Sequence, residues 1–156
     1  MLDVQGVVLH LFYYVDVYPT SHPPDRIRPR NKRDAGLRLA HLALDDTYGK
    51  FIGEYASPAF KAAQLKGDKV MISFDEVKKG LKMNGERIIG LKIAGADMEW
   101  KEADAKVKGN ELIVSASGLK WPVSIRYCFD DDSIGNLFST EGMPVGAFRT
   151  EEINRE

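Results

Sequence analysis

The residues best placed for chemistry lie in the segment Asp25–Lys32, which reads Asp-Arg-Ile-Arg-Pro-Arg-Asn-Lys. It follows an apolar run, Val7–Val17, and precedes a helical pattern, Lys32–Tyr48. Ligands of α/β proteins meet the chain at the carboxyl ends of strands, so a strand, a loop and a helix start in this order predict a functional loop. Arg28, at the centre of this loop, cannot act as a general base because the pKa of arginine lies above ~12.

Two further residue types could take part in acyl transfer. His22 lies in the same loop, three residues before Asp25, and could supply a base. We favour a solvated loop histidine instead, because the surrounding segment is rich in proline and polar residues, and we interpret His41 as a partly buried structural residue. A serine nucleophile needs a base that is itself oriented by a third group. No serine of the chain is predicted on a strand-to-helix elbow, and no Gly-x-Ser-x-Gly motif occurs.

The Asp25 loop resembles the late catalytic loop of carbohydrate O-acetylesterases of the sialate O-acetylesterase type, which are SGNH-type serine hydrolases. In that family the loop reads roughly Asp-x-His-Pro-x-Asn-Lys or Asp-x-x-His-Pro and supplies the Asp and His of the triad. Here Pro29, Asn31 and Lys32 match the pattern, and Asp25 matches the Asp three residues before the His. Arg28 stands at the His position. The resemblance therefore assigns Asp25 and Arg28 to the catalytic positions and implies that Arg28 is non-functional.

The resemblance continues through the second half of the chain. In the family a small β-sandwich follows the last catalytic helix and ends in a Phe-Arg-Thr motif. The matching segments are Ile88–Asp97, Pro122–Tyr127, Gly135–Phe138, Glu141–Pro144 and Phe148–Thr150, in the expected order. They imply the C-terminal part of an enzyme that hydrolyses O-acetyl esters on sugars, with the serine blocks upstream of Met1. This chain alone is then expected to be inactive, and its expected partners are an N-terminal SGNH part and an O-acetylated sugar.

The elements that would position the loop are a strand and a helix. The run Val7–Val17 is β-branched and aromatic, which is typical of a strand buried on both faces. The segment Lys32–Tyr48 has apolar residues at helical spacing, and Gly49 follows as a C-terminal cap. With most of a hydrolase domain absent, apolar side chains of both elements would lie bare, which predicts self-association. These side chains are Leu9, Leu11, Phe12, Leu39 and Leu42.

Beyond Phe51 the pattern changes to short alternating segments separated by glycine-rich turns, which is typical of an antiparallel sandwich. The predicted strands are Phe60–Leu65, Lys69–Phe74, Ile88–Ala94, Met98–Trp100, Ala105–Val107, Leu112–Ala116, Val123–Phe129 and Phe148–Thr150. A domain boundary is expected near Lys50–Pro58, which makes residues 1–50 the end of an SGNH hydrolase domain and residues 51–156 a β-sandwich domain. The predicted fold class is α+β, mostly β: the C-terminal strand and helix of an SGNH-type α/β domain followed by a small antiparallel β-sandwich.

Composition limits the other classes of function. The formal net charge of -1 gives no electrostatic case for binding nucleic acid or an anionic membrane. The run Val7–Val17 is too short for a membrane span, and without an evident signal peptide the sequence as written is expected to be cytoplasmic. Cys128 is the single cysteine and is expected to be buried.

No cofactor or metal is expected. The run Asp130-Asp131-Asp132-Ser133 could hold calcium but lacks the spacing of an EF-hand loop, and an acidic turn is favoured. The alternative function is a non-catalytic β-sandwich module that binds carbohydrate or protein. Four aromatic residues could form a carbohydrate-stacking surface, although strand aromatics of a small sandwich are more often core. They are Trp100, Trp121, Tyr127 and Phe138.

Overall fold

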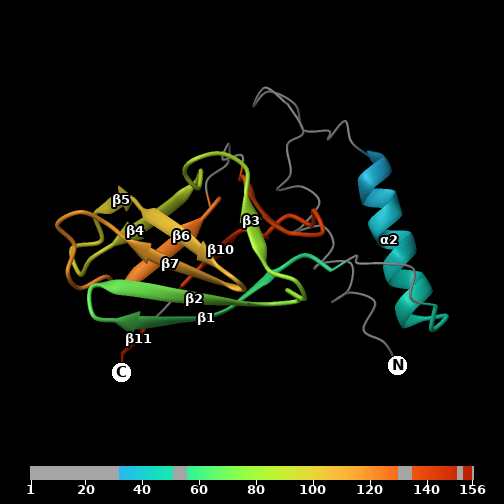
Figure 1. The fold of residues 1–156 in the computed structure, drawn as a ribbon, viewed down its shortest axis with the longest axis horizontal. Helices are drawn as coiled ribbons and strands as arrows, with labels where there is room; N and C mark the ends of the chain where they lie inside the picture. Colours follow the sequence, from blue (N-terminus) through green and yellow to red (C-terminus); the bar gives the residue numbers. More distant parts are fainter. Residues whose placement is uncertain (1–31, 51–55, 130–134, 151–152, 156) are drawn as a thin grey trace. The chain divides into compact units, whose positions relative to one another are not determined.

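A computed structural model of the protein describes residues 32–50, 56–129, 135–150 and 153–155. The chain divides into two compact units, residues 1–56 and residues 57–156. The first contributes one described helix, and the second contains all of the described strands (Figure 1).

The helix α2 spans Lys32–Asp46, where the helical spacing predicted it. Its C-terminal end is capped by Gly49, which adopts a left-handed conformation with φ of +60°. The Gly49 N–H donates to the carbonyl of Asp45 at 3.0 Å, which is the bond that a left-handed cap makes with the last turn. The Lys50 N–H donates to the carbonyl of Leu44 at 2.8 Å. A glycine is suited to this position because it has no Cβ to clash in the left-handed region.

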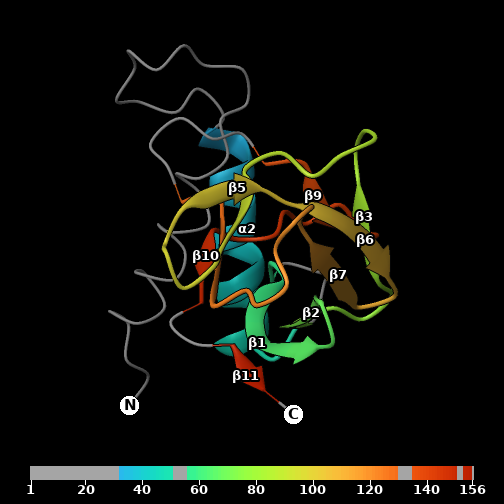
Figure 2. The same ribbon diagram turned by 90° about the vertical axis from the view of Figure 1, so that its left-hand side faces the viewer.

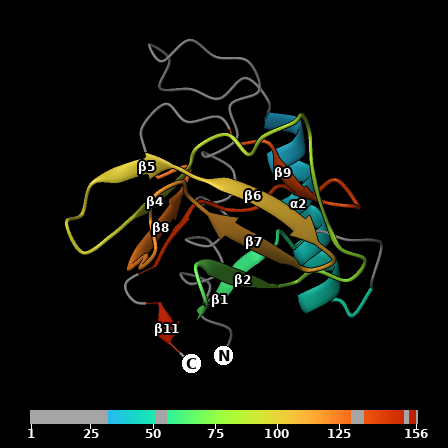
Figure 3. The same ribbon diagram turned by 60° about the vertical axis from the view of Figure 1, so that its left-hand side comes forward.

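The second unit consists of two main sheets and one small strand pair (Figures 1 and 3). The five-stranded sheet has the order β11-β1-β2-β7-β6, with β1 at Ala59–Lys66, β2 at Lys69–Asp75, β6 at Asp104–Lys108, β7 at Glu111–Ser115 and β11 at Asn154–Arg155. The four-stranded sheet has the order β10-β8-β4-β5, with β4 at Leu91–Ala94, β5 at Trp100–Glu102, β8 at Ser124–Tyr127 and β10 at Phe148–Arg149. The small pair joins β3 at Leu81–Met83 to β9 at Leu137–Ser139. All pairings are antiparallel except that of β1 with β11.

The two main sheets are joined where β5 continues into β6 (Figure 2). One residue, Ala103, separates the two strands, and it is buried. Its N–H donates to the carbonyl of Leu91 at 3.0 Å. The chain therefore leaves the four-stranded sheet and enters the five-stranded sheet within a single residue, which links the two layers of the sandwich covalently.

The core lies between the sheets, and Phe148 contacts aromatic rings of both. The ring of Phe148 stacks on Phe60 with centroids 5.1 Å apart and meets Phe74 edge-on at 5.6 Å. Both of these partners belong to the five-stranded sheet. The ring of Tyr127, the neighbour of Phe148 in the four-stranded sheet, lies 5.6 Å away. Offset and edge-on aromatic pairs add to the free energy gained from burying apolar area, so Phe148 ties the two sheets together.

The predicted fold class was wrong. The described chain is mostly β, with one helix of 15 residues, and the described residues contain no helix-rich α/β domain. A helical period predicts a single helix but not the repeated βα units that an α/β sheet requires. The strand predicted over Val7–Val17 lies outside the described residues. The predicted sandwich strands correspond to β1, β2, β4 to β8 and β10, whereas β3, β9 and β11 were missed.

Asn136 fastens the β9 segment to the loop that precedes β4. Its side-chain oxygen accepts the Ile89 N–H at 2.9 Å, and its side-chain nitrogen donates to the carbonyls of Asn84 and Arg87, both at 2.7 Å. The amide orientation follows from these partners, because one is a donor and two are acceptors. Its backbone carbonyl accepts the Asn84 N–H as well. Asn136 is buried, and its side-chain amide supplies the hydrogen bonds of three backbone groups of this loop.

We expect Asn136→Ala to lower the free energy of unfolding by about 2–3 kcal/mol, because it leaves one N–H and two carbonyl groups without their partner. Urea denaturation followed by tryptophan fluorescence measures this loss. The matched control is Asn110→Ala, since Asn110 is exposed and its side chain donates one described hydrogen bond, to the Val77 carbonyl at 2.9 Å. The control should lose less than about 1 kcal/mol. Equal losses in the two variants would contradict the role assigned to Asn136.

Candidate functional site

The two predicted catalytic positions, Asp25 and Arg28, lie outside the described residues, as does His22. His41 is half-buried within α2. All three histidines of the chain precede residue 57, so the second unit cannot supply a Ser–His pair from its own residues. Its serines serve the fold where their contacts are described: Ser124, for example, donates its hydroxyl to the Thr150 carbonyl at 2.9 Å. A Ser–His pair would therefore need a histidine from residues 1–56 or from another chain.

The Phe-Arg-Thr motif, which the family resemblance singled out, is structural. Phe148 fills the core, and the Thr150 hydroxyl accepts the Ile125 N–H at 2.8 Å. The Arg149 guanidinium lies over the ring of Phe129, 5.2 Å from its centroid. The motif closes the edge of the four-stranded sheet beside β8.

The segment Gly135–Phe138 is anchored on Tyr127. The Tyr127 hydroxyl accepts the Leu137 N–H at 3.1 Å, and a Cβ on Gly135 would overlap that hydroxyl. Such a Cβ would also come within 2.7 Å of the Cys128 sulfur. Cys128 is buried, as predicted. The glycine is therefore required by the close approach of the backbone to β8.

The four aromatic residues considered as a stacking surface do not form one. Tyr127 is fully buried, and Phe138 is half-buried on β9. The face of Trp100 is covered by Arg126, whose guanidinium carbon lies 4.3 Å from the ring centroid. Trp121 differs from these, because 65% of its surface is exposed. Of the set, Trp121 alone presents its indole to solvent in the described structure.

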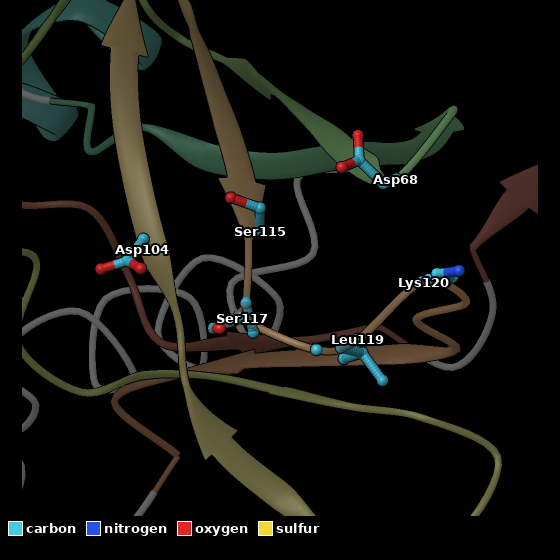
Figure 4. A pocket seen from close by; sticks show the side chains of 8 residues that line it. Asp68, Asp104, Ser115, Ser117, Leu119 and Lys120 are labelled. Carbon is cyan, nitrogen blue, oxygen red and sulfur yellow. The ribbon is translucent and has the colours of Figure 1, made fainter.

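A pocket of about 420 Å³ opens beside the segment that leads to Trp121 (Figure 4). Its lining combines polar and apolar surface and consists of Asp68, Asp104, Ser115, Ala116, Ser117, Gly118, Leu119 and Lys120. The sheet register explains this convergence. Val70 pairs with Val114, which brings the start of β2 beside the end of β7. Asp104 pairs with Ser115, which adds the start of β6 at the same sheet edge.

One carboxylate of the pocket is oriented by an ion pair. Arg87 donates to Asp104 at 2.9 Å, and this hydrogen bond, with the charge of Asp104, raises the pKa of Arg87 above its ordinary value. In the view of Figure 4 the Ser115 and Ser117 hydroxyls point to the side on which Asp104 lies. Asp68 and Lys120 stand on the other side of the two serines. The Lys120 side chain extends away from the two serines in this view, so the hydroxyls face Asp104 rather than the ammonium.

The loop that carries the pocket is held in place by a close packing contact. The Leu119 N–H donates to the Ala116 carbonyl at 3.2 Å across a turn that contains Gly118, whose φ is +74°. The Leu119 side chain lies against Gly95, where a Cβ would come within 2.9 Å of it. The sequence identified Trp121 as one of four candidate stacking residues, but no local pattern indicated that Asp68, Asp104 and Ser115 line one pocket.

The acidic run Asp130-Asp131-Asp132-Ser133 lies outside the described residues. Within the described ranges, no group of three His, Cys, Asp or Glu side chains is arranged to hold a metal ion. No helix among the residues that the structure describes has the length and apolar character to cross a membrane.

The comparisons with known proteins point to carbohydrate esterases. No family model matches the chain, and no curated protein matches it. The chain is similar to the crystal structure of a carbohydrate acetylesterase from Xanthomonas citri, with a TM-score of 0.77 and 34% sequence identity. The match covers 88% of this chain and 31% of that chain. The chain therefore spans about a third of the length of the enzyme that it resembles, and its likeness is to part of a carbohydrate acetylesterase.

Proposed function

We propose that the chain is the C-terminal part of a carbohydrate O-acetylesterase of the sialate type, an enzyme that hydrolyses O-acetyl esters on sugars. The observation that carries this proposal is the likeness to part of the Xanthomonas citri carbohydrate acetylesterase at 34% identity. The ordered motifs from Asp25 to Thr150 support it. In this proposal residues 1–50 form the end of the hydrolase domain, and residues 51–156 form the β-sandwich beside it.

The proposal assigns catalytic positions to Asp25 and Arg28. In the parent enzyme, the Asp would hold a histidine in its working tautomer, and the histidine would take the proton of a serine supplied by an N-terminal SGNH part. Arg28 can do neither task, because its guanidinium stays protonated. An exposed pair between Asp25 and Arg28 would be worth at most about 1 kcal/mol, which permits the substitution without explaining it.

We expect the purified chain to hydrolyse aryl acetates no faster than the buffer. The sandwich holds no histidine, and a nucleophile without an oriented base gives little catalysis. The measurement is release of nitrophenol from nitrophenyl acetate, with and without a serine-directed fluorophosphonate. Turnover that the fluorophosphonate abolishes would mean that the chain contains a complete nucleophilic site and that the expected inactivity of the chain is wrong.

A second candidate function is a non-catalytic module that binds carbohydrate. The observations that favour it are the pocket lined by Ala116–Lys120 and the exposure of Trp121, the next residue in the chain. The genomic sequence immediately upstream distinguishes the two candidates. A Gly-Asp-Ser or Gly-Asn-Asp region there supports a divided acetylesterase, whereas unrelated sequence favours the module.

A further inference from the structure

We propose that the pocket between the β1–β2 turn and the Ala116–Lys120 loop binds a neutral sugar ring, with Trp121 as an aromatic face at its rim. This inference goes beyond the proposed esterase function, because binding here needs neither a serine nucleophile nor the Asp25 loop. It assigns to the β-sandwich a sugar-contacting site of its own.

The size and lining of the pocket select the class of ligand. A volume of about 420 Å³ lies within the usual range of small-molecule sites, roughly 300–1,000 Å³. Five of its eight lining residues, Asp68, Asp104, Ser115, Ser117 and Lys120, have polar side chains, and the rest of the lining is apolar. A ligand that fits must therefore offer both polar and apolar groups. A ligand with several hydroxyl groups can both donate to carboxylates and accept from an ammonium.

The charges of the lining exclude strongly charged ligands. The carboxylates of Asp68 and Asp104 repel an anion, although Arg87 already neutralises part of the charge at Asp104. The ammonium of Lys120 opposes a cation, and the described residues offer no three-carboxylate group to hold a metal. A neutral polyol meets the lining without an uncompensated charge.

Trp121 adds the apolar contact that a sugar needs. The residue directly follows Lys120, the last residue of the pocket lining, and exposes 65% of its surface. Leaving an indole exposed to water costs free energy that contact with an apolar surface would recover. One face of a pyranose ring presents C–H groups, and aromatic rings supply large contact area at low entropic cost.

The position of the pocket also suits binding. Its side chains come from strand ends and from a loop that Gly95 and Gly118 allow to pack closely, so their backbones are held by the sheet. Asp104 has a partner in Arg87 at 2.9 Å, but both side chains are exposed, so this pair adds little to the preorganisation of the pocket. A shallow polar site of this kind is expected to bind with a dissociation constant of about 1 mM or weaker.

The test is an NMR titration of the whole 156-residue chain, labelled with nitrogen-15, against methyl β-galactoside, methyl α-glucoside, methyl β-xyloside and N-acetylglucosamine. Glucuronate serves as the anionic probe and cyclohexanol as the apolar one. We expect at least one neutral sugar to shift the backbone amides of Ser115–Trp121 and of Asp68, together with the Trp121 indole N–H. Neither control compound should do so at the same concentration.

Two variants test the assignment. Trp121→Ala and Asp68→Asn should each weaken binding by at least about 10-fold, the effect of losing a stacking face or a charge-assisted hydrogen bond. Their matched controls are Ile89→Ala, at an exposed apolar residue elsewhere, and Glu86→Gln, at an exposed carboxylate elsewhere. The controls should bind as the unchanged chain does, and all four should keep the amide spectrum of the folded core.

Absence of shifts with all four neutral sugars would overturn the proposal, as would shifts that both variants leave unchanged. Stronger shifts with glucuronate or cyclohexanol would show that the pocket selects another class of ligand. None of these outcomes bears on the esterase proposal, because the titration measures no turnover. The aryl-acetate assay in turn does not depend on the pocket.

Discussion

Phe148→Ala should destabilise the second unit by about 3–5 kcal/mol, the range measured when a buried phenylalanine is truncated in a packed core. The side chain is 6% exposed and contacts rings from both sheets: Phe60 and Phe74 on one side, and Tyr127 on the other. Its removal would leave a cavity at the place where the layers are joined. For a unit of this length the loss corresponds to a fall in Tm of roughly 12 °C or more.

Differential scanning calorimetry and urea denaturation of the whole chain measure this effect. The matched control is Phe129→Ala, because Phe129 is 37% exposed and its described ring contact is with the Arg149 guanidinium. It should lose about 1 kcal/mol or less, the value of an exposed cation–π contact. Phe148→Leu, which keeps most of the apolar volume, should lie between the two. If Phe148→Ala proved no more destabilising than Phe129→Ala, the role assigned to Phe148 in joining the two sheets would be wrong.

The second large effect concerns catalysis and rests on the proposed function. A fusion that places the serine-bearing N-terminal part of a sialate-type O-acetylesterase ahead of this chain should hydrolyse acetyl esters only after Arg28→His. The members of a triad act as a unit, and loss of one lowers kcat by about 10⁴-fold or more. We therefore expect Arg28→His to raise the turnover of the fusion by at least about 10³-fold.

Nitrophenyl acetate hydrolysis and labelling of the serine by a fluorophosphonate give two independent measurements. The matched control is Arg26→His, which introduces the same side chain two residues away and should leave turnover at its basal value. Asp25→Asn added to Arg28→His should abolish most of the gain, since the histidine then lacks the group that orients it. A fusion that turns over equally well with Arg28 would contradict the assignment of this position.

Local features of the chain could be predicted from the sequence because they depend on residues close together. The helix at Lys32–Asp46 follows from apolar spacing and ends at a glycine that can adopt positive φ. Strands β2 and β8 follow from strict alternation, as Val70, Ile72 and Phe74 illustrate. The fold class did not follow, because one helix and one apolar run cannot establish the repeated units of an α/β domain.

The strands β3, β9 and β11 were missed because each has only two or three residues, too few to display a period. They exist because distant partners complete their hydrogen bonds, as Leu81 does with Ser139 and Gln64 with Asn154. The same applies to Asn136. Its amide acts across 47 to 52 residues of sequence, a contact that no local pattern encodes.

The candidate site divides in the same way. The amino-acid sequence specifies which types of residue are available. They are a loop with Asp25 at the family's Asp position and Arg28 at its His position, several aromatic residues, and turns with carboxylates and glycines. Which aromatic ring stays mostly exposed to solvent could be learned only from the folded chain, because burial of Tyr127 and coverage of Trp100 depend on contacts across the sheet. The tertiary structure also decided that Asp68, Asp104 and Ser115 share one edge, since that meeting is set by the pairing register of three strands rather than by their spacing along the chain.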